Sequence, residues 1–265
     1  MKVEANGIEI HYELTGKEEL PVVMLSHSLA CSMVMWNPQM EVLLPHFRVL
    51  RFDTRGHGGS SAPKGTYTLE QLADDALALL DALRIDRVHF VGLSMGGMIG
   101  QSLALNHPDR LKSLTLCDTA AVIPHQAQPV WEERIEKARN KGMQALAQQT
   151  LERWFTQPYL EQSPPHVELI RSQILSTPVD GYIGCSEAIR RLNYLERLSK
   201  IALPTLVIVG EEDPGTPVEA AKAIHSRIRD SKLVILVSAA HLSNIEQAQY
   251  FNRALIAFLT GQSAG

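Results

Sequence analysis

Short apolar runs alternate with longer helical repeats along most of the chain. The runs, rich in β-branched residues or leucine, predict strands at Val3–Ala5, Ile8–Leu14, Val22–Ser26, Val49–Asp53, Val88–Leu93, Ser113–Cys117, Thr205–Gly210 and Lys232–Val237. Most of them lack a strict alternation of apolar and polar positions, which is typical of a sheet covered on both faces. Helical spacing occurs over residues 36–43, 69–83, 95–106, 218–227 and 244–259. The pattern predicts an α/β fold with an eight-stranded, mostly parallel sheet flanked by helices.

Two local signals mark boundaries of these elements. Asn6 and Gly7 separate the first two strands, and this dipeptide favours the tight turn of an antiparallel hairpin. Thr68 precedes the helix predicted from residue 69, where its hydroxyl can cap the first turn.

Residues 120–198 interrupt the alternation. Helical patterns occur at 131–139, 143–154, 166–175 and 184–195, with prolines between them and no convincing strand. We expect this stretch to be a helical cap inserted into the core, which then comprises residues 1–119 and 199–265. Such a cap would cover the carboxyl edge of the sheet, where α/β proteins bind ligands. The alternative is a set of peripheral helices remote from any ligand.

Composition limits the function classes. With 265 residues, of which 45% are hydrophobic, the chain can bury one large core. A formal net charge of −4 argues against nucleic acid as a partner, because phosphate binding needs clustered Lys and Arg. Residues 1–16 contain no apolar run long enough for a signal peptide or a membrane span, so we expect a cytoplasmic protein without membrane association. The sequence does not define the oligomeric state.

The chain has three cysteines, at Cys31, Cys117 and Cys185. Their odd number and wide spacing predict buried free thiols rather than a disulfide framework or a zinc site.

The segment Gly92-Leu93-Ser94-Met95-Gly96 has the pattern G-x-S-x-G. It lies between a predicted strand and a predicted helix, the arrangement in which a serine occupies a sharp, strained turn at the top of a sheet. The start of the following helix would present N–H groups toward a developing anion. We therefore predict that Ser94 is a nucleophile, the alternative being a tight turn without chemistry.

A serine nucleophile needs a base and an acid that orients the base. Asp213 follows the strand predicted at 205–210, and His241 follows the last predicted strand. This order along the chain, acid first and histidine second, suits a serine on a strand–turn–helix. We predict Asp213 as the acid and His241 as the base.

Other residues could take these roles. Asp118 follows the strand predicted at 113–117 and is the alternative acid. His27 and His57 also follow strands, but they precede Ser94 and lie in turns rich in serine or glycine. We expect both histidines to shape the backbone.

The site also needs N–H donors for an oxyanion. The amide of Met95, directly after the nucleophile, is one candidate. The other belongs to the loop after the third strand, where we predict Leu29. The loop Asp53–Ser60 is expected to shape this region rather than take part in chemistry.

Together these motifs resemble the α/β-hydrolase superfamily and, at a closer level, the 3-oxoadipate enol-lactonase family. The resemblance covers nearly the whole chain. Its broad marks are D-x-R-G-H-G at 53–58, G-L-S-M-G-G at 92–97, G-x-x-D-P at 210–214 and the late His241. Its closer marks lie at 28–29, 35–39, 116–121, 131–135, 152–156 and 240–247. The resemblance implies an α/β-hydrolase fold with an inserted cap, and an enzyme that opens an enol-lactone.

The chain departs from the family pattern at four positions. His27 stands where Asn is expected, Ala30 and Cys31 stand where Gly and a small polar residue are expected, and Gly215 stands where Ala is usual. The first three flank the predicted oxyanion loop, so they bear on the acyl side of the substrate and leave the mechanism intact.

If the resemblance holds, the substrate is an enol-lactone with a free carboxylate, and a cation should lie in the pocket. Arg134 in the predicted cap is the candidate, since its planar fork suits a carboxylate; a solvated charge is the alternative. Trp131 and Trp154 are expected to wall the pocket, or else to pack the cap. No metal or organic cofactor is expected, because the serine mechanism needs neither; in addition, no phosphate-binding glycine motif follows a strand.

Three other functions remain open. A carboxylesterase or lactonase for another small ester would keep every catalytic residue and differ only in its pocket. A C–C bond hydrolase would use the same residues, but its oxyanion loop would be expected to be glycine-rich. A ligand-binding protein without catalysis would be expected to lack one of Ser94, Asp213 and His241.

Overall fold

The centre of the molecule is an eight-stranded sheet with the strand order β1-β2-β4-β3-β5-β6-β7-β8. The computed structural model describes residues 1–263. The strands are β1 Lys2–Ala5, β2 Ile8–Thr15, β3 Val22–Ser26, β4 Arg48–Phe52, β5 Val88–Leu93, β6 Leu111–Cys117, β7 Thr205–Gly210 and β8 Lys232–Leu236. Every predicted strand is present. The pairs β1–β2 and β2–β4 are antiparallel, and all other neighbours are parallel.

Local sequence accounts for the central strands and the first turn. Every residue of β5 and of β7 is buried, as expected for apolar strands covered on both faces. Asn6 and Gly7 have φ angles of 47° and 73°, the left-handed backbone that a tight hairpin turn requires.

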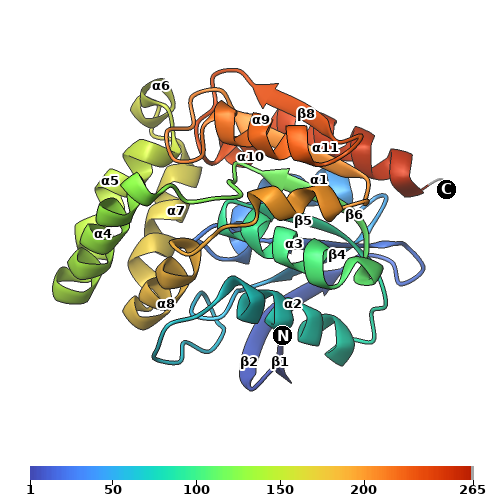
Figure 1. Cartoon of the computed structure of the whole chain (residues 1–265), viewed down its shortest axis with the longest axis horizontal. Coiled ribbons are helices and arrows are strands. Elements are labelled where there is room, and N and C mark those ends of the chain that lie inside the picture. The colour runs from blue at the N-terminus through green and yellow to red at the C-terminus, as the bar shows by residue number, and fades with distance from the viewer. Residues whose placement is uncertain (264–265) are drawn as a thin grey trace.

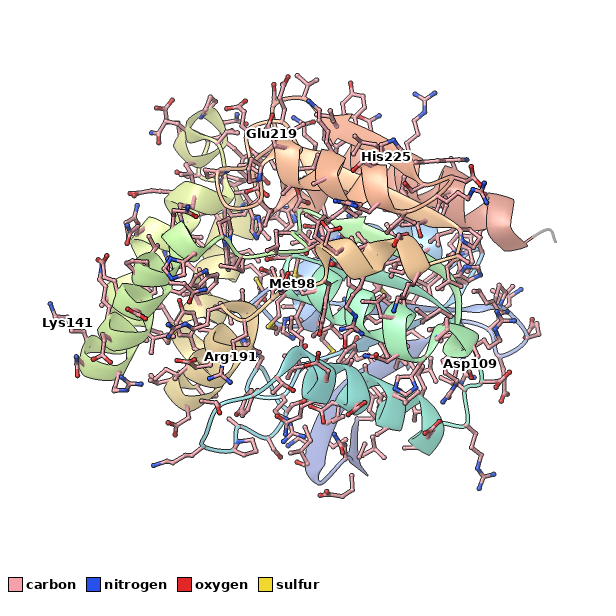
Figure 2. The ribbon with its side chains drawn as sticks, viewed as in Figure 1. Met98, Asp109, Lys141, Arg191, Glu219 and His225 are labelled. Atoms are coloured by element: carbon pink, nitrogen blue, oxygen red, sulfur yellow. The ribbon has the colours of Figure 1, made fainter. Side chains whose placement is uncertain are left out.

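Helices of the core cover this sheet. They are α1 Asn37–Leu43, α2 Leu69–Ala82, α3 Met95–Asn106, α9 Val218–Arg227, α10 Ser243–Glu246 and α11 Ala248–Ser263. As predicted, the Thr68 hydroxyl accepts a hydrogen bond from the Gln71 amide, at 3.0 Å, and caps α2. Met98 of α3 lies near the middle of the molecule in Figure 2 and is 3% exposed.

The prediction of one helix over residues 244–259 was wrong. The chain leaves the helical backbone at Gln247, which has φ −120° and ψ 47°, so α10 and α11 are separate. Side chains of α10 bond to other parts of the fold: the Asn244 amide donates to the Met35 carbonyl, and the Glu246 carboxylate accepts from Ala240. These tertiary bonds set the direction of α10 against the continuous helical pattern.

The helices α4–α8, which we call the cap helices, gather on one side of the molecule in Figure 1. They are α4 Gln128–Lys141, α5 Gln144–Trp154, α6 Gln157–Glu161, α7 Pro165–Ser176 and α8 Val179–Ile189. Figure 2 places Lys141, at the end of α4, far from the sheet. Within the described part of residues 120–198, β structure is confined to an isolated bridge between Val122 and Asn193. The limits of the cap at residues 120 and 198 stay a prediction.

One cap helix lies elsewhere than predicted. The pattern indicated a helix over 184–195, whereas α8 covers 179–189. Gly181 and Gly184 weaken the helical signal in the sequence, but both pack closely. A β-carbon at Gly181 would lie 2.0 Å from the Gly56 carbonyl oxygen, and one at Gly184 would lie 2.6 Å from the Tyr67 ring. Close packing of the two glycines against Gly56 and Tyr67 therefore compensates for their low helix propensity. The short helix α6 was not predicted.

The register of the sheet brings the loops that carry the predicted catalytic residues to one edge. Ser26 pairs with Gly92, Leu93 pairs with Cys117, and Gly210 pairs with Leu236. Because these strands are parallel, the loops that follow β3, β5, β6, β7 and β8 all begin at the same edge of the sheet.

Two further observations concern bulk properties. None of the helices in residues 1–263 is both long and apolar enough to cross a membrane. The three cysteines are free and buried, as predicted from their spacing.

Candidate active site

Ser94 occupies the turn between β5 and α3 with φ 57° and ψ −114°. A left-handed φ at a residue with a side chain is strained and persists only where the surroundings hold it. Here the Ser94 amide donates to the Cys117 carbonyl at 2.8 Å, and the Thr119 hydroxyl donates to the Ser94 carbonyl at 2.7 Å. Both bonds come from the end of β6 and fix the turn.

Two glycines around Ser94 allow the turn to close. A β-carbon at Gly92 would lie 2.1 Å from the carbonyl oxygen of Gly96, and one at Gly96 would lie 2.2 Å from that of Ser26. Neither distance is tolerable, because backbone atoms block the space. The sequence G-x-S-x-G is therefore required by packing around this turn.

Asp213 and His241 lie together at the ends of β7 and β8. The His241 Nδ1 and Asp213 Oδ2 atoms are 2.7 Å apart, and the residues are 5% and 3% exposed. Burial disfavours the Asp213 carboxylate, but its electrostatic interaction and hydrogen bond with His241, together with hydrogen bonds from Thr216, outweigh burial and lower the pKa of Asp213 below its ordinary value. The pair can thus hold a proton on Nδ1 and present Nε2 as a base.

Thr216 is a supporting residue that the sequence analysis missed. Its amide donates to Asp213 Oδ1 at 3.0 Å, and its hydroxyl donates to Asp213 Oδ2 at 2.6 Å. The Gly215 amide also donates to Oδ1, at 2.8 Å. The signal was present, since an Asp followed by a Thr three positions later is typical of a turn closed by side-chain bonds.

Asp118, the alternative acid, bonds to other groups. Its Oδ1 accepts from the Gly210 amide at 2.8 Å, and its Oδ2 accepts from the Ser243 hydroxyl at 2.5 Å. Burial, together with the negative charge of Asp213, raises the pKa of Asp118 well above its ordinary value. Asp118 thus links the segments that carry Asp213 and His241. Among the described residues it forms no hydrogen bond with the His241 imidazole.

The loop after β3 has the Leu29 amide available for an oxyanion. The amides of Ser28, Ala30 and Cys31 donate to Met35 Sδ, His57 Nε2 and the Ser28 carbonyl, respectively. Within residues 1–263, the amides of Leu29 and Met95 have no such acceptor. The two N–H groups predicted for the oxyanion are therefore unused by the protein itself.

His27 and His57 stabilise the loops after β3 and β4 by accepting hydrogen bonds from backbone amides. His27 Nε2 accepts from the Thr54 amide at 2.9 Å, and His57 Nε2 accepts from the Ala30 amide at 2.9 Å. Accepting at Nε2 requires neutral rings. Consistent with this, burial lowers the pKa of His27. The pKa of His57 is lowered to about 3, mainly by burial and to a smaller extent by electrostatic repulsion from His27.

The cap helix α5 places one of the predicted tryptophans against His241. The Trp154 and His241 rings stack with centroids 6.0 Å apart and an interplanar angle of 29°. Trp131 is half-buried, and the Arg134 guanidinium lies over its ring at 5.2 Å. Trp154 is thus part of the site, whereas Trp131 contacts the predicted cation.

A second guanidinium, missed by the sequence analysis, lies near Arg134. Burial lowers the pKa of Arg134, and burial together with the positive charge of Arg134 lowers the pKa of Arg153 to about 10. The Tyr182 hydroxyl interacts electrostatically with both. Among the described residues neither arginine forms an ion pair with a carboxylate. Position 153 could have been found from its place beside Trp154.

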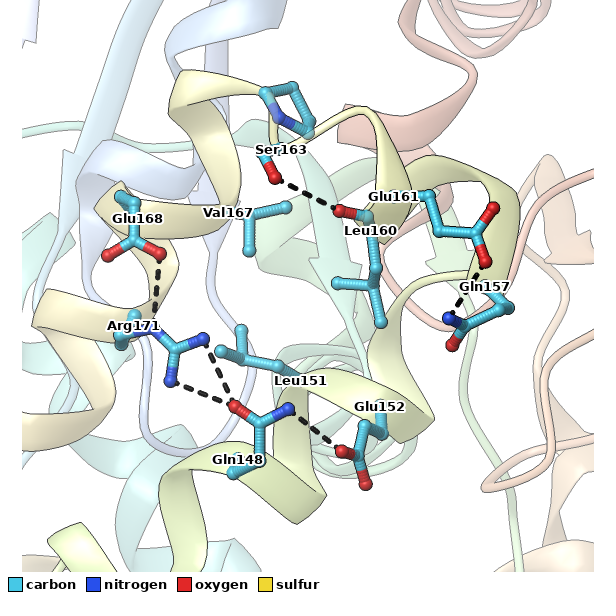
Figure 3. Close-up of a pocket in the computed structure, with 11 residues that line it drawn as sticks. Gln148, Leu151, Glu152, Gln157, Leu160, Glu161, Ser163, Val167, Glu168 and Arg171 are labelled. Atoms are coloured by element: carbon cyan, nitrogen blue, oxygen red, sulfur yellow. Dashed lines mark hydrogen bonds and ion pairs between the residues drawn. The ribbon is translucent and has the colours of Figure 1, made fainter.

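A separate cavity of about 260 Å³ opens among α5, α6 and α7 (Figure 3). Leu151, Leu160 and Val167 line it, and Arg171 bonds to Glu168 and Gln148 at its rim. None of the predicted site residues lines this cavity.

The described residues contain no group of three or more His, Cys, Asp or Glu side chains that could hold a metal ion.

Comparison with known proteins assigns the fold family. A family model described as the alpha/beta hydrolase fold matches residues 21–248. The chain belongs to the alpha/beta hydrolase fold family. It is 37% identical to 3-oxoadipate enol-lactonase 2 of Acinetobacter baylyi, over 96% of this chain and 94% of that protein. The crystal structure of the enol-lactonase from Burkholderia xenovorans LB400 superposes with a TM-score of 0.95, at 43% identity over 98% of this chain and 100% of that one.

A different activity is named for another relative. The chain is 30% identical to a putative carbamate hydrolase, RutD, of Agrobacterium fabrum, over 94% of this chain and 98% of that protein. The predicted alpha/beta hydrolase fold and the resemblance to 3-oxoadipate enol-lactonases are confirmed, and the chain is an ester-hydrolysing enzyme of this family.

Proposed function

We propose that the protein is a serine hydrolase that opens the ester bond of 3-oxoadipate enol-lactone through an acyl-enzyme on Ser94. The observation that carries the hydrolytic part is the 2.7 Å bond between His241 Nδ1 and Asp213, at the same sheet edge as the strained turn of Ser94. The names of the Acinetobacter and Burkholderia relatives support the choice of substrate.

In the first half of the reaction, His241 Nε2 takes the proton of the Ser94 hydroxyl as its oxygen attacks the lactone carbonyl. Asp213 holds the imidazole and stabilises its protonated form. The carbonyl oxygen becomes an oxyanion, which accepts hydrogen bonds from the amides of Leu29 and Met95.

Collapse of this intermediate breaks the bond to the ring oxygen. The ring oxygen leaves as an enol after taking the proton from His241, and conjugation makes it a good leaving group. Because the ester is cyclic, the enol stays tethered to the acyl group. Water activated by His241 then attacks the acyl-enzyme, and the product leaves whole as 3-oxoadipate after tautomerisation.

The two cap guanidiniums suit a substrate with a free carboxylate. Arg134 and Arg153 are both half-buried. Burial first, and the charge of Arg134 second, lower the pKa of Arg153 to about 10, and a bound anion would offset both effects. We assign the carboxylate of the lactone to this pair, with Trp154 beside His241 as a wall of the acyl site.

Other ester hydrolases are the second candidate. A carboxylesterase or a lactonase for another small substrate would use the same catalytic groups and differ at the cap. The likeness to the putative carbamate hydrolase falls in the same class of alternatives, since a carbamate carbonyl can meet the same nucleophile.

The test compares kcat/KM for 3-oxoadipate enol-lactone and for a neutral p-nitrophenyl ester. We expect a preference for the lactone of about a hundredfold or more, equivalent to roughly 2.7 kcal/mol of transition-state binding. A preference for the neutral ester would leave the serine mechanism in place and overturn the assignment of the substrate.

A further inference from the structure

The loop that carries His241 is held on both sides of that residue. The Ala240 amide, before His241, donates to Glu246 Oε2 at 2.8 Å. The Leu242 amide, after it, donates to the Trp154 carbonyl at 3.0 Å. One anchor belongs to α10 and the other to the last turn of α5, so the cap helices take part in fixing this loop.

Glu246 also reaches the cap. Its Oε1 accepts from the Thr156 amide at 3.0 Å and from the Thr156 hydroxyl. Its carboxylate therefore links two backbone segments that are far apart in sequence: the residue before His241 and the residue that precedes α6.

The Glu246 carboxylate is buried among other acidic groups, so it depends on its hydrogen-bond donors. Glu246 is 9% exposed, and burial raises its pKa despite these hydrogen bonds. The neighbouring side chains that act electrostatically on Glu246, those of Glu212 and Asp118, are also acidic. Among the described residues, Glu246 forms no ion pair. A buried carboxylate is tolerated only while its donors are in place, so the bonds from Ala240 and Thr156 are needed together.

We propose that Glu246 is a positioning residue that couples the cap to His241, so that the seating of residues 154–156 sets the orientation of the base. This proposal rests on the proposed role of His241. The coupling has a direct route to the substrate, because Arg153 directly precedes Trp154. A substrate carboxylate held by Arg153 would fix the last turn of α5. The Trp154 carbonyl, which holds the His241 loop directly, and Thr156, which holds it through Glu246, would then be fixed as well.

The experiment measures the rate constant for covalent inactivation by a fluorophosphonate, which reports how well the base activates the serine and needs no knowledge of the natural substrate. Glu246→Gln presents an NH₂ group or a weaker acceptor to donors that need a carboxylate. Thr156→Val removes the hydroxyl at nearly constant shape, and Thr156→Ser keeps it as the matched control.

We expect Glu246→Gln and Thr156→Val to lower the inactivation rate constant by about tenfold, as the loss of one charge-assisted hydrogen bond would. Thr156→Ser should stay within about twofold of the unmodified protein, by the same reasoning. With a neutral p-nitrophenyl ester, kcat should fall and KM should stay unchanged, because neither residue contacts the substrate.

The outcomes separate this proposal from the proposed function. Absence of labelling at Ser94 in the unmodified protein would overturn the serine mechanism. Normal labelling of Ser94 with unchanged rates in folded Glu246→Gln and Thr156→Val would overturn the coupling alone. Equal losses in Thr156→Val and Thr156→Ser would also overturn it, since the serine retains the hydroxyl. Thermal unfolding identifies any variant that fails to fold, in which case the other substitution decides.

Discussion

The sheet edge and the cap differ in how their charges are satisfied. At the sheet edge, both carboxylate oxygens of Asp213 accept hydrogen bonds from within the protein, and its partner His241 is held at 2.7 Å. In the cap, Arg134 and Arg153 lie close enough to repel each other, and within residues 1–263 neither forms an ion pair with a carboxylate, although the charge of Glu133 acts on Arg134. Under the proposed function, the first region carries out the chemistry and the second binds the carboxylate of the substrate. We therefore propose that reaction type depends mainly on the sheet edge and substrate choice mainly on the cap.

Replacing Ser94 by alanine should produce the largest loss of activity. Under the proposed function, the sheet edge carries out the chemistry for every substrate that the cap admits. We expect Ser94→Ala to lower kcat by about 10⁴-fold or more for every ester, with little change in Tm. Steady-state kinetics and thermal unfolding measure the two quantities. Esterase activity near that of the unmodified protein would exclude Ser94 as the nucleophile.

Removing a cap cation should affect only some substrates. We expect Arg134→Ala to lower kcat/KM for a carboxylated lactone by about 10- to 100-fold, the value of one charge-assisted hydrogen bond, and to leave a neutral ester within about twofold. Arg139→Ala is the matched control, because Arg139 is an exposed residue of the same helix that pairs with Glu136. Equal losses on both substrates would remove the distinction between the two regions.

The smallest effect concerns the support of the oxyanion loop by His57. The pKa of His57 is about 3 in the folded protein against an ordinary value of 6.5, so between these limits the unfolded chain binds more protons. The free energy of unfolding should therefore fall as the pH drops from 6.5 toward 3, by about 1.4 kcal/mol per pH unit for this group. Urea unfolding at pH 5 and pH 6 measures the slope.

A glutamine at this position provides the comparison. The Gln carbonyl in His57→Gln can still accept the Ala30 amide bond but cannot be protonated in this range. We expect its slope to be shallower by about 1.4 kcal/mol per pH unit, and identical slopes would show that His57 does not titrate on unfolding.

The parts of the molecule that sequence patterns predicted are those set by local interactions. The strands and the Ser94 turn follow from apolar runs and from glycines whose spacing suits one backbone path. The positions of Asp213 and His241 follow from the order of the strands, since each residue comes directly after one.

The remaining parts depend on contacts between segments distant in sequence. The start of α8 depends on Gly181 packing on Gly56, and neither glycine indicates a helix by itself. The break at Gln247 depends on bonds from α10 to other loops. The sequence places Arg153 beside Trp154, but its proximity to Arg134 depends on the packing of α4 against α5, a contact that helical periodicity does not define.

The bridge between Val122 and Asn193 has a consequence for the history of such folds. The Tyr194 amide donates to the Ala121 carbonyl at 2.7 Å, and the Ile123 amide donates to the Leu192 carbonyl at 3.1 Å, so the chain leaves and re-enters the core at one narrow neck. An insertion whose ends already meet adds little loop-closure entropy when its length changes, because that cost grows only slowly with length. We therefore expect changes of length beyond the neck to be tolerated while the strands beneath keep their register, as long as the bonds of Trp154 and Thr156 to the His241 loop and Glu246 are kept.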